Sequence, residues 1–235
     1  MKRRINVSLH DLPVVEEHPS DFRNTQSWRV LRILGEFISG FNFLADYNDV
    51  QTISVFGSTQ PKEGEHWYDL AHELGTSLAK AGYGVVTGGG PGIMEAANRG
   101  AFEAEGHSIG FTIQLPFEER VNPYVTDSMP FHYFFSRKVM LSFAAQAYIY
   151  FPGGFGTINE FFEIAELIYT KKISQRVPVI LVGSEYWKPL VEWLEKDTGA
   201  RLRYITEDGL LIYRVVDTVD EIMDIVKKTV HVKYF

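Results

Sequence analysis

Glycine-rich turns follow short apolar runs at three places in this chain, and a helical pattern resumes after the turns. The runs are rich in β-branched and aromatic residues and too short for helices, whereas the stretches after them repeat apolar side chains every three or four residues. A strand–helix–strand unit of this kind pairs its strands in parallel and lays the helix across the sheet. The sequence therefore predicts an α/β fold, a doubly wound, mostly parallel, Rossmann-like sheet with helices on both faces.

The expected elements follow this alternation. Strands are expected at 52–56, 84–87, 107–113, 147–151, 177–182 and 210–215, and helices at 65–80, 93–105, 134–145, 157–169, 186–196 and 218–228. Residues 114–130 contain three prolines and are expected to form an ordered functional loop. An extra N-terminal helix is expected over 25–48, because apolar residues recur there at helical spacing. Residues 1–24 are predicted to be a flexible arm, and 49–235 to be the main domain.

Composition removes several classes of function. The chain has 235 residues and no cysteine, which excludes disulfides and thiolate chemistry and is compatible with a reducing cytoplasm, the expected location. A net charge of −7 argues against a nucleic-acid binder that works through bulk electrostatics. The longest uncharged run, 139–159, is broken by proline and glycine, so no membrane segment is expected. The seven histidines lack metal-ligand spacing, and no metal site is expected.

The three glycine turns are expected to converge on one ligand. They lie at 57–58, 88–92 and 153–157. Ligands of open parallel sheets bind at the carboxyl ends of strands, where glycine N–H groups and a helix N-terminus favour a phosphate. Neither longer turn fits the dinucleotide pattern G-x-G-x-x-G, and no P-loop occurs, so a mononucleotide-sized ligand fits better. The alternative is that each turn is simple chain punctuation, which is the more common case for a single isolated turn.

Three charged residues accompany these turns. Glu160 falls in the first turn of the helix predicted after the third glycine turn, where it would face the ligand. The alternative is a capping box, in which Thr157 caps the helix and Glu160 bonds back to it. Arg137 and Lys138 open another predicted helix beside a group of aromatic residues, and the alternative for them is a solvated surface pair.

The segments 88–96 (GGGPGIMEA) and 152–160 (PGGFGTINE), with Arg137 and Lys138 between them, closely resemble the LOG family. This family comprises the cytokinin-activating phosphoribohydrolases, once labelled possible lysine decarboxylases. The resemblance spans about residues 51–195 and includes the complete PGGxGTxxE pattern. It implies a Rossmann-like homodimer that hydrolyses the N-glycosidic bond of a nucleoside 5′-monophosphate, AMP or an N6-modified AMP, without a cofactor. The products would be a free base and ribose 5-phosphate.

The resemblance also implies roles for single residues. Arg137 and Glu160 match the family's catalytic arginine and glutamate. Substrate-binding positions are matched by Gly57, Ser58, Gly88, Gly89, Gly90, Gly92, Met94, Lys138, Gly153, Gly154, Gly156 and Thr157, and Glu119 is assigned to the same group. Glu160 would stabilise an oxocarbenium-like ribose and orient or deprotonate a water, and Arg137 would stabilise the leaving base or keep Glu160 ionised.

Two further functions stay open at this point. A non-catalytic carrier or sensor of a nucleotide or phosphorylated cofactor, similar to the molybdenum-cofactor carriers, needs the glycine turns but no carboxylate beside the sugar. A pyridoxal phosphate decarboxylase needs a lysine for its Schiff base, and Lys138 is the only lysine near the predicted site. The presence of both Arg137 and Glu160 favours catalysis over the carrier.

Overall fold

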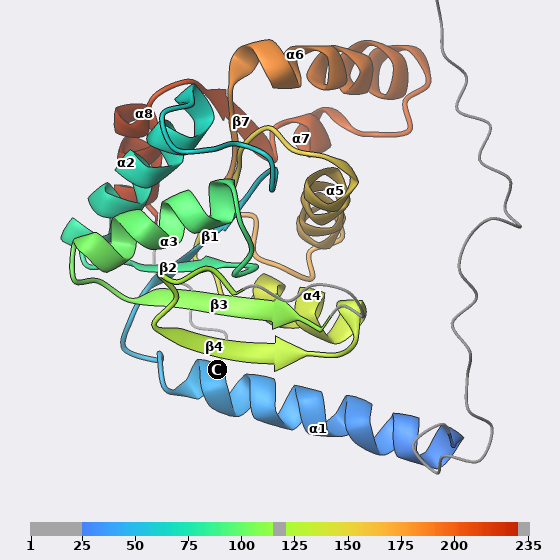
Figure 1. Cartoon of the computed structure of the whole chain (residues 1–235). Helices are drawn as coiled ribbons and strands as arrows, with labels where there is room; N and C mark the ends of the chain where they lie inside the picture. The colour runs from blue at the N-terminus through green and yellow to red at the C-terminus, as the bar shows by residue number, and fades with distance from the viewer. Residues whose placement is uncertain (1–24, 115–120, 230–235) are drawn as a thin grey trace, which may run out of the picture.

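The computed structural model describes residues 25–114 and 121–229, and its seven strands form one parallel sheet (Figure 1). The order across the sheet is β4-β3-β2-β1-β5-β6-β7. The strands are β1 (Thr52–Phe56), β2 (Gly84–Thr87), β3 (Ser108–Ile113), β4 (Asp127–Phe131), β5 (Tyr148–Tyr150), β6 (Val179–Val182) and β7 (Tyr213–Val216). The predicted α/β architecture is confirmed. The predicted arm over 1–24 and Glu119 lie outside the described residues.

Helices cover both faces of this sheet. They are α1 (Gln26–Ala45), α2 (His66–Lys80), α3 (Ile93–Glu103), α4 (Phe134–Phe143), α5 (Phe155–Tyr169), α6 (Ser184–Trp193), α7 (Glu207–Leu210) and α8 (Val219–Lys227). A π-helical stretch, Leu194–Arg201, continues α6. Among the described helices, none combines the length and apolar character that a bilayer-spanning segment requires.

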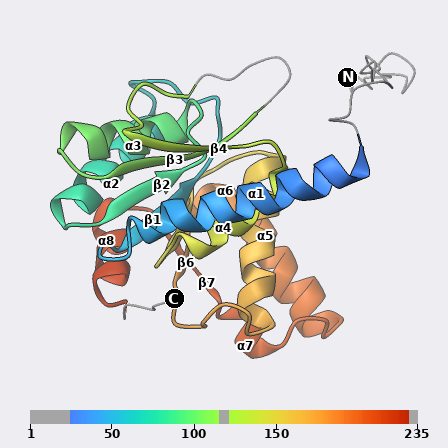
Figure 2. The ribbon, with the colours of Figure 1, turned by 90° about the horizontal axis from the view of Figure 1, so that it is seen from below.

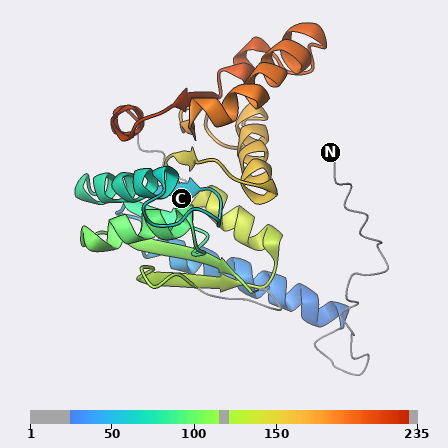
Figure 3. The same ribbon diagram turned by 45° about the horizontal axis from the view of Figure 1, so that its top comes forward.

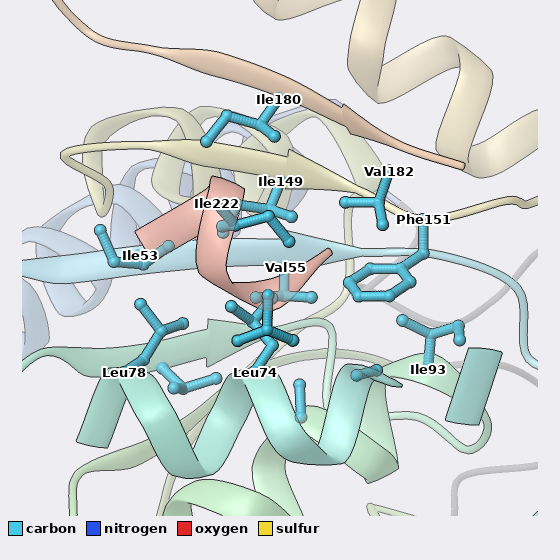
Figure 4. Close-up of a cluster of buried hydrophobic side chains, with 14 of the residues drawn as sticks. Ile53, Val55, Leu74, Leu78, Ile93, Ile149, Phe151, Ile180, Val182 and Ile222 are labelled. Atoms are coloured by element: carbon cyan, nitrogen blue, oxygen red, sulfur yellow. The ribbon is translucent and has the colours of Figure 1, made fainter. Parts of the chain in front are cut away.

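Side chains of the central strands alternate between two separate cores. Ile53 and Val55 of β1 pack with Leu74 and Leu78 of α2 and with Ile222 of α8 on one face (Figure 4). Phe56 of β1 and Tyr148 and Tyr150 of β5 belong to the opposite core, which packs against α1, α4, α5 and α6. Figure 3 shows α1 and the α2–α3 pair on opposite sides of the strands. Because strands buried on both faces have no polar side, they read as continuous apolar runs in the sequence.

The strand order reverses direction between β1 and β5. The chain runs outward from β1 through β2 and β3 to β4, and then returns through α4 to β5, which pairs with the other side of β1. Such a reversal opens a crevice at the carboxyl ends of the two central strands, where ligands of open α/β sheets bind. The glycine turns at 57–58 and 153–157 follow these two strands directly.

One expectation about the loop at 114–130 is wrong. Its last residues form β4, an edge strand that pairs in parallel with β3 and aligns Pro130 with Thr112. Proline has no N–H to donate and is tolerated in a strand that has a neighbour on one side only. Most of β4 is exposed, so it lacks the apolar run by which the inner strands were predicted.

Helix α1 lies across the β4 end of the sheet and over α4 (Figure 2). Thr25 caps it by accepting a hydrogen bond from the Trp28 N–H. Its buried face carries Glu36 and Gly40, one helical turn apart, while apolar residues such as Leu31 and Ile38 remain exposed on its other side. The predicted N-terminal helix is therefore present and packs on the side of the sheet that carries α4.

Candidate active site

The three glycine turns meet at Ser58. The Ser58 N–H donates to the Pro152 carbonyl at 3.0 Å, and the Ile93 N–H donates to the Ser58 carbonyl at 3.0 Å. A Cβ atom on Gly92 would overlap the Ser58 carbonyl oxygen, and one on Gly153 would lie 3.1 Å from the Ser58 nitrogen. Glycine at these two positions thus allows the turns after β1, β2 and β5 to touch through their backbones.

Buried polar side chains hold the turn at 88–92 in place. The Asn122 N–H donates to the Gly89 carbonyl at 2.8 Å, and its side-chain amide donates to the Gly90 carbonyl at 3.0 Å. The same amide reaches Asn98 Oδ1 at 3.0 Å, which also accepts from the Thr87 hydroxyl at 2.6 Å. Sequence reasoning missed both asparagines, although Asn98 is the one amide side chain on the otherwise small, apolar buried face of α3.

Arg137 is anchored against the same turn. Its side chain is half-buried, and its Nε donates to the Phe111 carbonyl of β3 at 2.7 Å. A Cβ atom on Gly88 would overlap the guanidinium, so glycine at this position makes room for the arginine. Burial lowers the pKa of Arg137 from its usual value, and the charge of Glu160 partly offsets this effect. The alternative of a solvated arginine is wrong.

Lys138 is paired with a residue that the sequence analysis did not single out. Its ammonium group lies 2.5 Å from Glu163 of α5, and both side chains are largely shielded from solvent. The ion pair joins α4 to α5 beside Glu160. Nothing in the sequence indicated this ion pair, because Lys138 and Glu163 lie on two different helices and are 25 residues apart.

Glu160 lies on α5 next to these charges. Burial raises the pKa of Glu160 to about 7, while the positive charges of Arg137 and Lys138 lower it and that of Glu163 raises it further. The acid is therefore poised to exchange protons near neutral pH. Its backbone is fixed as well, because the Tyr150 hydroxyl donates to the Glu160 carbonyl at 3.2 Å.

The capping-box alternative for Glu160 is wrong. Helix α5 begins at Phe155, two residues before the predicted start, and its N-cap is Gly154, which has no capping side chain. Thr157 is thus buried within the first turn, and Glu160 falls in the second turn instead of the first. The Tyr186 hydroxyl of α6 donates to the Gly153 carbonyl, a further support that the sequence analysis missed.

Open space lies on one side of the turn at 153–157. No atom comes within 4 Å of where a Cβ would stand on Gly154 or Gly156, and Phe155 between them is 96% exposed. Across the site, the Met94 side chain packs against Gly88 and Gly90. The structure thus places the three glycine turns, Met94 and Arg137 in contact with one another, and Glu160 within reach of the charges of Arg137 and Lys138. Within the described part of the chain, no three His, Asp or Glu side chains gather to hold a metal ion.

Known proteins resemble this chain in sequence and fold. A family model described as "Possible lysine decarboxylase" matches residues 94–226. A cytokinin riboside 5′-monophosphate phosphoribohydrolase from Rhodococcoides fascians is 26% identical over 62% of this chain and 74% of its own length. A pyrimidine/purine nucleotide 5′-monophosphate nucleosidase from Escherichia coli is 28% identical over 64% of this chain and 36% of its own length.

A solved molybdenum cofactor carrier protein from Chlamydomonas reinhardtii shares the fold. It superposes with a TM-score of 0.56 at 22% identity, over 76% of this chain and 97% of its own length. The family match covers more than half of the chain and includes α4 with Arg137 and α5 with Glu160. The chain therefore belongs to the LOG family, whose model carries the lysine decarboxylase description.

Proposed function

We propose that this protein hydrolyses the N-glycosidic bond of a nucleoside 5′-monophosphate, AMP or an N6-modified AMP, to a free base and ribose 5-phosphate. The observation that carries the proposal is Glu160, a carboxyl group with a pKa of about 7 beside Arg137 and Lys138, at the edge where three glycine turns meet. The names of the relatives, a phosphoribohydrolase and a nucleotide nucleosidase, support the same reaction.

The glycine turns suit the 5′-phosphate. Gly154 and Gly156 leave room for an anion at the N-terminus of α5, where unpaired N–H groups and the helix dipole favour negative charge. The phosphate takes no part in bond breaking. Its role is to place the ribose C1′ near Glu160, so that binding energy from a distant group lowers the barrier of the chemical step.

Glu160 and Arg137 then divide the chemistry. The C1′–N bond breaks and its electron pair moves to the base, which leaves positive charge on the ribose for the Glu160 carboxylate to stabilise. Glu160 accepts a proton from water as the water oxygen bonds to C1′. Arg137 stabilises the departing base, which takes up a proton from solvent, and Glu160 later returns to solvent the proton it accepted from water. The Phe111 carbonyl fixes the orientation of the Arg137 guanidinium.

Incubation of the purified protein with AMP, an N6-modified AMP and the other nucleoside monophosphates tests the proposal. Release of free base and ribose 5-phosphate is followed by chromatography, and Glu160→Gln and Arg137→Ala are expected to lose turnover. Glu166→Gln is the matched control, because it removes a carboxylate from an exposed position of the same helix. Turnover that survives Glu160→Gln contradicts the mechanism.

A non-catalytic carrier of a nucleotide or phosphorylated cofactor is the second candidate. The open space over Gly154 and Gly156 suits an anionic group whether or not a bond is cleaved, and the protein that shares the fold is named as a cofactor carrier. Calorimetric binding of AMP without turnover of any nucleoside monophosphate would favour this function. A homodimer and a cytoplasmic location belong to the main proposal, and light scattering after gel filtration tests the dimer.

A further inference from the structure

Helix α4 carries Arg137 and Lys138 but supplies no cap of its own. It begins at Phe134, its N-cap Tyr133 makes no side-chain hydrogen bond to the helix, and its first turn contains no acidic residue. The first N–H groups of a helix have no partners within the helix and need acceptors from elsewhere when they are shielded from water. Arg137 stands only one turn beyond this uncapped start.

A carboxylate from α1 binds the backbone just before this start and a hydroxyl of the first turn. Glu36 is 9% exposed, and its Oε1 accepts a hydrogen bond from the His132 N–H at 2.8 Å. Its Oε2 accepts from the Tyr133 N–H at 3.4 Å and from the Ser136 hydroxyl. A negative charge at this place also complements the positive end of the α4 dipole. Glu36 thus acts as a cap on the chain that enters α4, through His132, the N-cap residue Tyr133 and the Ser136 hydroxyl, from 100 residues away in the sequence.

Close packing holds this cap in position. One helical turn after Glu36, Gly40 is buried against α4, and a Cβ atom there would lie 2.6 Å from Met140 Sδ. Gly35, which precedes Glu36, faces open space with no atom within 4 Å of its Cβ position. The contact is therefore specific to one face of α1, which crosses α4 (Figure 2).

We propose that Glu36 is a positioning residue of the active site, which fixes the start of α4 and through it the place of Arg137 relative to Glu160. The inference rests on the proposed function only for its kinetic test. Without the carboxylate, the N–H groups of His132 and Tyr133 lose their acceptors and the first turn of α4 loosens. Arg137 follows that turn, because its backbone N–H is bonded to the Tyr133 carbonyl.

A titration of unliganded protein tests this without any assay of turnover. The side-chain carboxyl carbon of Glu160 is followed by ¹³C NMR in wild type, Glu36→Ala and Arg137→Ala, and its signal is assigned with Glu160→Gln. Because Arg137 lowers the pKa of Glu160, Glu36→Ala is expected to raise it in the same direction as Arg137→Ala. Glu36→Gln keeps an oxygen for the His132 N–H, so its rise in the pKa of Glu160 is expected to be smaller than that of Glu36→Ala. Gly35→Ala is expected to leave the pKa of Glu160 at the wild-type value.

A double-mutant cycle provides the kinetic test. With AMP as substrate, Glu36→Ala is expected to lower kcat by roughly 10–100-fold, the range that a small misplacement of a catalytic group produces, with a smaller change in KM. When Arg137 is already replaced by alanine, Glu36→Ala is expected to lower kcat little further, because Glu36 acts by positioning Arg137. The proposal is overturned if the losses in kcat from the two substitutions multiply. It is also overturned if Arg137→Ala changes the pKa of Glu160 and Glu36→Ala does not.

The two failures are distinguishable. If the wild type hydrolyses no nucleoside monophosphate, the proposed function fails, and the NMR titration still decides the role of Glu36. If the wild type hydrolyses AMP and neither the titration nor the cycle responds to Glu36, only the positioning role fails. Should Glu36→Ala not fold by circular dichroism, Ser136→Ala removes one hydrogen bond of the same cap and is carried through both tests.

Discussion

Glu160 meets two opposing requirements at a single side chain. Its proposed role needs a carboxylate, but its partial burial favours the protonated acid and raises its pKa to about 7. Arg137 and Lys138 act against this burial, so the group titrates in the neutral range instead of remaining protonated. The charges that set the pKa of Glu160 belong to Arg137 and Lys138 on α4 and to Glu163 on α5, and each can be removed by a single substitution.

The pH dependence of turnover follows from this balance. A carboxylate that must be ionised is inactive below its pKa, so kcat/KM for AMP is expected to fall about tenfold per pH unit below about pH 7 and to level off above it. Steady-state rates from pH 5 to pH 9 measure the profile. A profile that declines as the pH rises through 7 would show that Glu160 acts in its protonated form.

The Lys138–Glu163 ion pair allows the midpoint of that profile to be shifted in both directions. Glu163→Gln removes a negative charge that raises the pKa of Glu160, so the midpoint should move to lower pH. Lys138→Met removes a positive charge that lowers it, so the midpoint should move to higher pH. The same kcat/KM series measures both. Shifts in the same direction for the two variants would contradict this electrostatic account.

Stability provides a test at the same residue that needs no substrate. The folded-state pKa of about 7 lies above the usual 4.5, so ionised Glu160 destabilises the folded chain, and this cost grows as the pH rises from about 4.5 to 7. Glu160→Gln is therefore expected to raise the free energy of unfolding by about 1–3 kcal/mol at pH 8 and by almost nothing at pH 4.5. Urea unfolding at the two pH values measures this, with Glu166→Gln as the control.

At the scale of elements, the turns that follow β2 and β5 tolerate side chains in different ways. Gly88→Ala places a methyl group where the Arg137 guanidinium lies, and a loss of about 100-fold in kcat/KM is expected from its displacement. Gly154→Ala meets no atom within 4 Å, so the free energy of unfolding should stay within about 0.5 kcal/mol. Because we place the phosphate there, KM for AMP should rise. An unchanged KM in Gly154→Ala would remove this turn from the binding site.

Helix α1 contains its own matched pair of glycines. Gly35→Ala adds a methyl group in open space within a helix and is expected to stabilise the protein by about 0.5–1 kcal/mol. Gly40→Ala pushes against Met140 and is expected to destabilise it by about 1–3 kcal/mol. Thermal or urea unfolding of the two variants measures the difference. Equal effects at both positions would mean that α1 does not rest on α4.

The elements could be predicted where their signal is local. The inner strands read as apolar runs ended by glycine, and the helices after them as regular apolar repeats, so the order of elements and the three turns follow from short stretches of sequence. Strand β4 gave no such run, because it lies at the edge and contains Pro130. The start of α5 was misplaced because Thr157 and Glu160 have the spacing of a cap, whereas the helix begins at Phe155 with Gly154 as its N-cap.

The site was predictable in part for the same reason. The residues in the turns and on the helices after them stood out as a pattern, whereas the residues that hold them in place through hydrogen bonds and ion pairs did not. Asn98 with Asn122, Lys138 with Glu163, and Glu36 with Ser136 are pairs between elements far apart in the chain. Each partner alone is an ordinary polar residue in a helix or loop. Only the fold brings the two partners into contact, and such contacts between distant residues cannot be inferred from a single sequence.

At the scale of the whole molecule, the sheet reconciles an acidic chain with the anionic ligand that we propose. The net charge of −7 repels a phosphate at long range, so attraction must come from N–H groups and from Arg137 and Lys138 at short range. The reversal of strand order between β1 and β5 gathers these groups at one edge, while both cores lie behind it.

The bond between Glu36 and Ser136 also sets an order of events during synthesis. Helix α1 leaves the ribosome first, but the hydroxyl that its carboxylate binds is made 100 residues later, which at about 5–20 residues per second is a delay of roughly 5–20 s. In that interval the Glu36 carboxylate has no Ser136 hydroxyl from which to accept a hydrogen bond. The contact of α1 with α4 can therefore form only after the whole sequence between the two helices has been translated.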